Sequence, residues 1–321
     1  MDTSVLVQGD FRDAMYKQHP VVRNAVKIVT RSVREAERAV SAAILHRDPG
    51  TYFVAEPRVG KTTTIEMIKS VLHDPFPGVP VWDVIAKRHI SRSEKTFFGD
   101  VLLELNQEAS GSATAARRRG LIFNHLLATC RTLKSDQTVL FIDEGQNWSE
   151  FEYELLRDLI NDLRKAGVVC LTIIFAHPNL DRKVKADLLG RGRTDLTGRF
   201  LVSQHQFRGV STREELRDIF GAYDNARMYE FPRGSDVSYS QFFKPRWFEQ
   251  GWRLGDEANN AWAGFTSRSR RSDRSGTSLG MQWVSGAIRN FLFETSELDW
   301  PLPTGQLWEH AISAATYDLA V

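Results

Sequence analysis

Short apolar runs alternate with amphipathic stretches over the first two thirds of the chain. In the stretches between the runs, hydrophobic residues recur at helical spacing, most clearly over 150–166. The runs have the length of buried strands and cover residues 51–55, 79–86, 138–143, 168–176 and 200–207. Strands that alternate with helices are typical of a parallel sheet covered by helices. The pattern therefore predicts an α/β fold.

The two ends of the chain lack this alternation. Apolar positions over 21–29 and 33–45 predict helices before the first strand. The last third predicts helices over 211–223, 246–265, 279–293 and 306–319, with core tryptophans Trp247, Trp252 and Trp262. Ser93 and Ser211 are the expected N-caps of the helices that follow them. We expect three parts: a helical linker segment at 1–50, an α/β core at 51–208 and a smaller α-helical region at 209–321.

The turn after the first predicted strand, AEPRVGKT at 55–62, has the spacing of a phosphate-binding P-loop with alanine at the first glycine position. In such a loop the backbone N–H groups point at phosphates, and the following helix directs its positive end at the anion. Lys61 would reach the terminal phosphates, and the Thr62 hydroxyl would ligate Mg²⁺. The alternative is a lysine on a helix after an ordinary turn. We assign to the ATP site Arg58, Val59, Gly60, Lys61, Thr62 and Thr63.

A second candidate motif ends the apolar run VLFIDE at 139–144, roughly 80 residues after the P-loop. Asp143 at the strand end would hold Mg²⁺, and Glu144 would polarise the attacking water. The alternative is a strand followed by an ordinary polar loop. Two adjacent carboxylates, with no guanine-recognition sequence, favour ATP hydrolysis over a GTPase switch.

Polar residues after the next strand, and arginines beyond it, complete the candidate chemistry. His177 or Asn179 would sense the terminal phosphate, although His177 could equally cap a helix or end a strand. Arg199, just before the last apolar run, is the chosen arginine for stabilising charge on a transferring phosphoryl group. Arg191 and Arg193 are its rivals, and all three are alternatively exposed loop arginines.

The order of these motifs resembles the AAA+ ATPases over about residues 21–293. Within that class, FIDEGQNW, TIIFAHPNL, and GRF followed by FRGVSTREEL resemble the TnsC/TniB group of ATP-dependent regulators of transposition. The same segments also resemble the bacterial secretion ATPases related to ExeA. The resemblance implies an AAA+ P-loop parallel sheet flanked by helices, with the α-helical region as its lid.

The TnsC/TniB resemblance also implies partners and roles. ATP-bound members assemble as rings or filaments around double-stranded DNA and connect a target-selection protein to the transposase, and hydrolysis resets the assembly. Arg199 fits the arginine finger, while His177 stands where the group has a polar sensor, often glutamine. The G-x-x-R sequence at 286–289 makes Arg289 the candidate second sensor. We also assign Val22 to the nucleotide site.

Three basic clusters are candidate contacts to DNA phosphates, which would provide affinity without reading sequence. The first contains Arg88, Arg92 and Lys95. The second is the run Arg117, Arg118 and Arg119, and the third lies in the serine-rich segment 266–278. The alternative for each cluster is a solvated surface patch.

Composition and charge exclude several other classes. The chain has 321 residues, of which 26% are charged and 42% hydrophobic, as in ordinary globular proteins. Two cysteines, Cys130 and Cys170, cannot form a disulfide framework, and both lie in apolar runs that predict reduced core thiols. The net charge of +2 neither requires nor excludes DNA. No apolar run is long enough to span a membrane, and no secretory signal is visible, so we expect a cytoplasmic protein.

Three functions are compatible with these features. The first is an ATP-dependent, DNA-binding regulator of transposition that hydrolyses ATP slowly, with Mg²⁺ as cofactor and further copies of itself as partners. The second is a secretion-type ATPase that acts on protein or cell-envelope partners. The third is a small-molecule P-loop kinase, which the paired carboxylates and the helical lid disfavour. Nucleotide-dependent binding to duplex DNA is expected only of the first.

Overall fold

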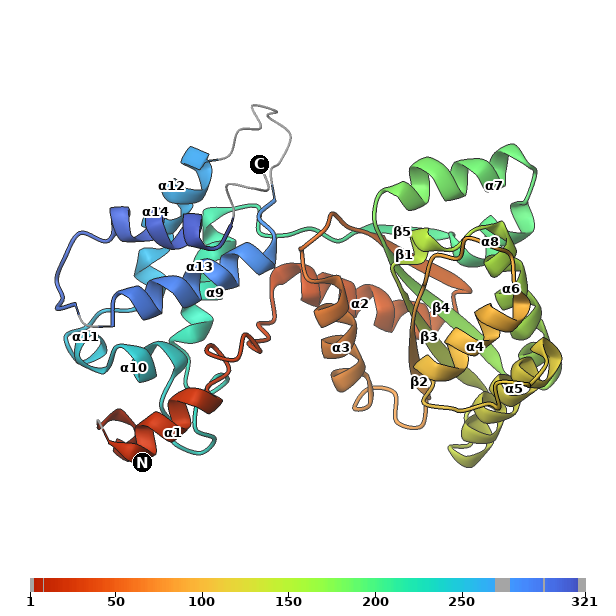
Figure 1. Ribbon diagram of the computed structural model, residues 1–321, viewed down its shortest axis with the longest axis horizontal. Helices are drawn as coiled ribbons and strands as arrows, with labels where there is room; N and C mark the ends of the chain where they lie inside the picture. The colour runs from red at the N-terminus through yellow and green to blue at the C-terminus, as the bar shows by residue number, and fades with distance from the viewer. Residues whose placement is uncertain (1–2, 8, 269–277, 297, 317–321) are drawn as a thin grey trace. The chain divides into compact units, whose positions relative to one another are not determined.

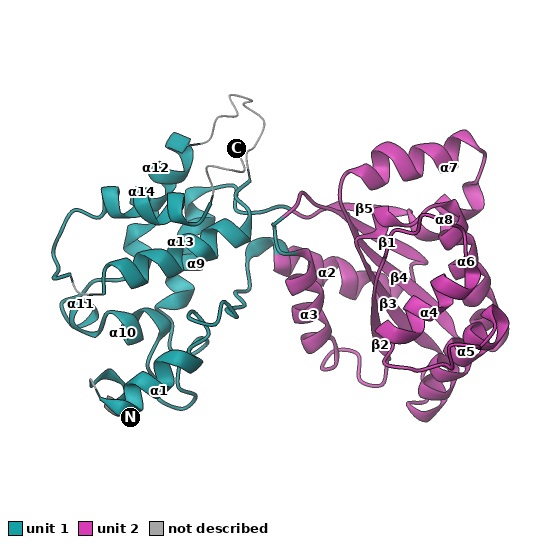
Figure 2. Cartoon of the chain, viewed as in Figure 1, with its two compact units in different colours: residues 1–32, 58–60, 208–321 teal, residues 33–57, 61–207 magenta. Residues whose placement is uncertain are grey.

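The computed structural model describes residues 3–7, 9–268, 278–296 and 298–316. Its contacts divide the chain into two compact units (Figure 2). The α/β unit contains residues 33–57 and 61–207. The helical unit contains residues 1–32, 58–60 and 208–321. This division splits the first 50 residues, which we expected to form one segment, between the two units.

One parallel sheet forms the centre of the α/β unit, with strand order β2-β3-β4-β1-β5. All five predicted strands are present, and the AAA+ type of α/β fold is confirmed. The carboxyl ends of parallel strands share one edge, so the segments that follow β3, β4 and β1 are neighbours there. The strands are β1 (Gly50–Val54), β2 (Val81–Ile85), β3 (Gln137–Asp143), β4 (Val169–Ala176) and β5 (Ser203–Gln206).

Helices cover both faces of this sheet (Figure 1). On one face lie α2 (Arg31–His46) and α3 (Lys61–Leu72). The other face carries α4 (Glu94–Glu104), α5 (Ala115–Thr132) and α6 (Glu150–Lys165). Short turns of helix complete the unit: η2 (Gly145–Asn147), the π-helix η3 (Leu180–Lys185), α7 (Ala186–Gly190) and α8 (Thr194–Phe200). Cys130 and Cys170 are unpaired and buried, as predicted.

Local capping explains where several helices begin. Ser93 caps α4 as predicted, accepting a hydrogen bond from the Thr96 N–H at 3.2 Å. The apolar spacing over 121–133 predicts a helix that begins at residue 121. This start is wrong, because Thr114 caps α5 earlier by accepting a hydrogen bond from the Arg117 N–H at 3.2 Å. The predicted cap at Ser211 is also wrong. The Thr212 hydroxyl takes that place, since it bonds to the Glu215 N–H at 3.2 Å.

The helical unit is built around a core of aromatic side chains, in which the ring of Phe291 stacks on Trp308 at 4.1 Å. Trp247 and Trp252 are buried in this core, as predicted. No helix of the described residues has the length and apolar character needed to cross a membrane. The elements are η1 (Thr3–Leu6), α1 (Asp10–Gln18), α9 (Arg213–Tyr223), α10 (Tyr239–Phe243), α11 (Pro245–Glu249), η4 (Leu254–Glu257), α12 (Ala258–Arg268), α13 (Met281–Glu294) and α14 (Gly305–Ala314).

The predicted helix over 21–29 is absent, because residues 20–24 form turns and 25–30 have no regular structure. Val21 and Ile28 are nevertheless buried in the core of the helical unit. Their apolar spacing therefore reflects packing of an irregular segment against the unit. Periodicity alone cannot distinguish the two cases.

His19 anchors this irregular segment. It is 0% exposed, and its Nδ1 accepts a hydrogen bond from the Val21 N–H at 3.1 Å. Its Nε2 has no hydrogen-bond partner among the described residues. Burial lowers the pKa of His19 to about 3. Four rings surround it at centroid distances of 4.6 to 5.0 Å: Phe231, Tyr239, Phe242 and Phe243.

We expect the helical unit to lose stability as the pH falls from about 6.5 toward 3. The unfolded chain protonates His19 near its ordinary pKa, whereas the folded chain does so only near pH 3, so acid favours the unfolded state. Between pH 7.5 and pH 5.0 the contribution is about 2 kcal/mol. Urea unfolding followed by tryptophan fluorescence measures it. An equal loss in His19→Phe would contradict the assignment to this residue.

Candidate nucleotide site

The candidate site lies where β1, β3 and β4 end at the same edge of the sheet. Lys61 begins α3 directly after the P-loop, and its side chain is only 8% exposed. Its Nζ lies 3.5 Å from Glu144 Oε1. The Thr62 hydroxyl donates a hydrogen bond to Asp143 Oδ2 at 2.5 Å. The fold thus brings together the two motifs that the sequence separates by roughly 80 residues.

Asp143 and Thr62 supply the oxygen atoms that Mg²⁺ prefers. Asp143 is buried at the end of β3, and burial raises its pKa. The hydrogen bonds from the Thr62 hydroxyl and the Glu144 N–H act to lower the pKa, but burial outweighs them. A cation beside this carboxylate would favour its charged form. The donor set therefore fits a magnesium ion held jointly with nucleotide phosphates.

Glu144 follows in a left-handed backbone conformation, with φ at 56°. Such a conformation is uncommon for a residue other than glycine and is often found at functional sites. The next residue must be glycine. A Cβ on Gly145 would lie 2.4 Å from Ile174 Cγ2 and 3.3 Å from the Tyr153 hydroxyl. This tight turn against β4 directs the Glu144 carboxylate toward Lys61.

His177 follows β4 and, rather than Asn179, directs its side chain toward the P-loop. Its Nδ1 accepts a hydrogen bond from the Asn179 N–H at 3.1 Å, so the neutral ring carries its proton on Nε2. That Nε2 lies 3.7 Å from Glu56 Oε2. The arrangement gives His177 a donor aimed at the loop that would hold phosphates.

Residues 58–60, in the middle of the P-loop, belong to the helical unit. The carbonyl of Arg58 accepts a hydrogen bond from the Gln282 N–H at 3.2 Å, and its guanidinium lies 5.3 Å from the centre of the Trp283 ring. Val59 is buried, and Gly60 has a φ of +102° that favours glycine. Thr63 is exposed on α3.

Two assigned residues lie elsewhere in the helical unit. Val22 packs against the core of that unit. Arg289 is well inside α13, about 12 Å along the helix from Met281. The first turn of α13, not Arg289, supplies the contacts to Arg58.

The three candidate arginines differ in their partners. Arg193 bonds to Glu154 and Asp195, and Arg191 lies 3.1 Å from Glu150. Across the described residues, Arg199 makes no hydrogen bond or ion pair. Burial lowers its pKa, with help from two neighbouring arginines. Arg199 belongs to α8 and is half-buried, so the alternative of an exposed loop arginine does not describe it.

Arg199 also lies away from the P-loop of its own chain. Its carbonyl would be 2.2 Å from a Cβ on Gly50, the first residue of β1, whereas the P-loop follows the last residue of that strand. Arg199 therefore lies at the end of β1 that is opposite the P-loop.

The first basic cluster follows β2. Arg88 and Arg92 are exposed and line a pocket of about 420 Å³. His89 fixes the loop between them through Asp100, at 2.9 Å, and Glu152, at 3.3 Å. Burial acts to lower the pKa of His89, but the two carboxylates outweigh it and raise the pKa. Lys95 is exposed at the start of α4.

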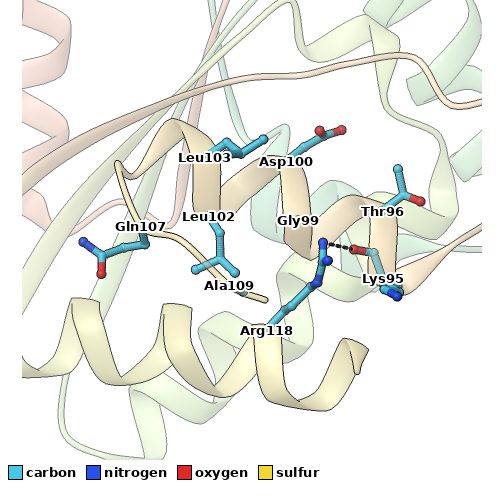
Figure 3. A pocket seen from close by; sticks show the side chains of 9 residues that line it. All are labelled: Lys95, Thr96, Gly99, Asp100, Leu102, Leu103, Gln107, Ala109 and Arg118. Carbon is cyan, nitrogen blue, oxygen red and sulfur yellow. Dashed lines mark hydrogen bonds between the residues drawn. The ribbon is translucent and has the colours of Figure 1, made fainter. Parts of the chain in front are cut away.

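Two of the three arginines in the second basic cluster bond to other residues of the same chain. Arg118 lies across α4, where its Nη1 donates to the Lys95 carbonyl at 3.2 Å over Gly99 (Figure 3). Arg119 forms an ion pair with Asp162. Arg117 is exposed. In the third cluster, Arg268 lies 4.0 Å from Glu309, and its other arginines fall outside the described residues.

Sequence reasoning missed one residue of the site. Gln146 bonds to both Glu144 and the backbone of His177. Its only sequence signal is its place two residues after the Asp-Glu pair, in FIDEGQNW.

Comparisons with known proteins agree with this fold. Residues 46–184 match the family model of the AAA domain. No curated protein matches the sequence. The Aeropyrum pernix ORC2 protein is similar in two solved structures, each with a TM-score of 0.50. Its ADPNP-ADP complexes have 11% identity and cover 90% of this chain and 68% of that chain. The ADP form has 12% identity and covers 92% and 70%.

Domain III of the Thermotoga maritima replication initiation protein DnaA is a further similar structure. It has 15% identity and a TM-score of 0.46, over 89% of this chain and 94% of that one. At these identities the likeness to ORC2 shows the fold alone. The matched segment contains both the P-loop and the Asp143-Glu144 pair. Residues 46–184 are therefore similar to an AAA domain, within a chain that has the AAA+ P-loop fold.

Proposed function

We propose that this chain is an ATP-dependent, DNA-binding regulator of DNA transposition of the TnsC/TniB kind. The observation that carries its ATPase part is the joint placement of Lys61 with Glu144 and of Thr62 with Asp143. An AAA domain belongs to a family of nucleotide-hydrolysing ATPases, which supports the same conclusion. Its assignment to transposition rests on the sequence resemblance.

The proposed reaction is attack of water on the γ-phosphorus of ATP. The water oxygen bonds to phosphorus, the bond to the β–γ bridging oxygen breaks, and ADP and phosphate leave. Glu144 accepts the proton of the water, and Lys61 binds the terminal phosphates. His177 donates to the γ-phosphate from Nε2. Thr62 and Asp143 would hold Mg²⁺, which would neutralise phosphate charge.

We further propose that Arg199 completes the site of a neighbouring copy in a ring or filament. Its lack of partners among the described residues and its distance from its own P-loop support a role in trans. Arg191 and Arg193 are less suited, because carboxylates of the same chain already engage them.

Arg88 and Arg92 are the proposed contacts to the DNA backbone. Both are exposed, and the loop that carries them is held by His89. Phosphate contacts of this kind make binding salt-dependent, because each neutralised phosphate releases a counterion. A transposase, a target-selection protein and a cytoplasmic location remain part of the proposal.

Duplex DNA binding with and without a slowly hydrolysed ATP analogue tests this function. We expect rings or filaments on DNA only with the analogue, visible by negative-stain imaging. In the variant with Arg88→Ala and Arg92→Ala, affinity should fall, and the slope of log K against log salt should shrink by about 2.

Arg131→Ala provides the matched control, since Arg131 is an exposed arginine near the start of β3. It should leave both affinity and slope unchanged. Wild-type monomers that bind nucleotide but no DNA would exclude the regulator and favour the secretion-type ATPase. An unchanged slope in the double variant would contradict the assignment of Arg88 and Arg92 as DNA contacts, but not the proposed function.

A further inference from the structure

The side chain of Gln146 links the segments that follow β3 and β4. Its Nε2 donates a hydrogen bond to Glu144 Oε2 at 2.5 Å. Its Oε1 accepts a hydrogen bond from the backbone N–H of His177 at 2.8 Å. A single half-buried amide thus joins the carboxylate that follows β3 to the residue that follows β4.

The orientation of this amide follows from its partners. A backbone N–H can only donate, so the amide oxygen must face His177 and the amide nitrogen must face Glu144. A carboxylate can accept the resulting N–H bond, and both ends of the amide are satisfied. In the flipped orientation, the amide nitrogen would face the His177 N–H, which is also a donor. The amide oxygen would then face the Glu144 carboxylate, which is also an acceptor.

The turn that carries Gln146 is itself held at Gly145. The Gly145 carbonyl accepts a hydrogen bond from the Tyr153 hydroxyl at 2.9 Å. Close packing of Gly145 on Ile174 leaves no room for a side chain there. The backbone of Gln146 therefore has little freedom to shift.

We infer that Gln146 is a positioning residue that orients the Glu144 carboxylate for attack on ATP and couples it to the end of β4. This inference rests on the proposed ATPase function. Gln146 holds one oxygen of Glu144, which leaves Oε1 facing Lys61 at 3.5 Å, toward the space for the terminal phosphate. Without that bond, a carboxylate that is 36% exposed would sample several rotamers.

The hydrogen bond from the His177 N–H also couples the Gln146 side chain to the end of β4. His177 directs its ring toward Glu56 in the P-loop, while its backbone N–H holds Gln146. A shift of His177 toward a bound γ-phosphate therefore moves the acceptor oxygen of Gln146, and with it the donor that orients Glu144.

The first test needs neither nucleotide nor turnover. Hydrogen exchange of the His177 amide is measured in the nucleotide-free chain for wild type, Gln146→Ala and Gln146→Glu. Alanine removes the acceptor, so the amide should exchange faster by about 10-fold or more. Glutamate keeps an oxygen at that position, so exchange should remain close to wild type. Unchanged exchange in Gln146→Ala would overturn the link to β4.

The second test separates kcat from KM. Gln146→Ala and Gln146→Glu should both lower kcat by about 10- to 100-fold, because neither side chain can donate to Glu144. KM for ATP should stay within about twofold of wild type, since the Gln146 side chain bonds to Glu144 and to the His177 backbone, not to the P-loop. With Glu144→Gln already present, adding Gln146→Ala should cost nothing further, because Gln146 acts only through Glu144.

Asn147→Ala is the matched control, because Asn147 lies in the same turn and bonds to Ala86 instead of Glu144. It should keep kcat close to wild type. A loss in Asn147→Ala equal to that in Gln146→Ala would overturn the positioning role in favour of general turn stability. A hydrolysing wild type with normal kcat in Gln146→Ala would overturn this inference alone. A wild type that binds ATP without hydrolysis would overturn the proposed ATPase function and the catalytic half of the inference.

Discussion

Lys61→Ala is expected to weaken ATP binding by about 100-fold, which corresponds to about 2.7 kcal/mol and is typical of losing charge-assisted hydrogen bonds. Lys61 is buried at the start of α3, and its ammonium group lies beside Glu144 at the carboxyl edge of the sheet. Removing this ammonium leaves the terminal phosphates facing Glu144 with no side-chain cation between them. Calorimetric titration with a slowly hydrolysed ATP analogue measures the loss directly.

The same variant should form no nucleotide-dependent assemblies on DNA. Lys69→Ala is its control, because Lys69 lies on the same helix and pairs with Asp83 at the surface, away from the P-loop. The control should bind the analogue as wild type does. ATP affinity within threefold of wild type in Lys61→Ala would refute the phosphate role of this lysine.

Glu144→Gln should retain ATP binding and lose hydrolysis by about 100- to 1,000-fold, on the scale of removing a general base. Glutamine keeps the shape of the side chain but cannot accept the proton of the attacking water. Single-turnover measurement of phosphate release separates this loss from any change in binding. Because hydrolysis is proposed to reset the assembly, complexes on DNA should persist in the variant with ATP itself.

Glu108→Gln is the control for charge removal, since Glu108 is an exposed carboxylate after α4. It should hydrolyse ATP at the wild-type rate. Rapid phosphate release by Glu144→Gln would mean that another group activates the water. Loss of ATP binding in the same variant would show that Glu144 acts on the ground state, through its contact with Lys61.

Much of the α/β fold follows from the sequence pattern. The buried strands have apolar runs of the right length, and helices with one apolar face separate them. The prediction fails where a side-chain cap or long-range packing decides the element. Thr114 starts α5 before the apolar pattern does, and Val21 and Ile28 are buried without any helix. These choices depend on contacts that periodicity does not contain.

The candidate site divides in the same way. The sequence by itself determined Lys61, Thr62, Asp143 and Glu144 as candidates, because phosphate and magnesium chemistry requires those groups next to a strand end. Tertiary structure decided between residues that look alike in sequence. Carboxylates of α6 pair with Arg191 and Arg193 but not with Arg199, and the fold of the β4 end directs His177 rather than Asn179 toward the P-loop.

Only the structure revealed Gln146, because its role depends on β3 and β4 being neighbours with a fixed register. A glutamine two residues after a carboxylate has no chemistry of its own in the sequence. Its proposed role depends on the parallel sheet, which brings the backbone N–H of His177 within hydrogen-bond distance of the amide that also bonds to Glu144. The sequence thus specifies which groups can do chemistry, and the packing of strands and helices decides which of them meet.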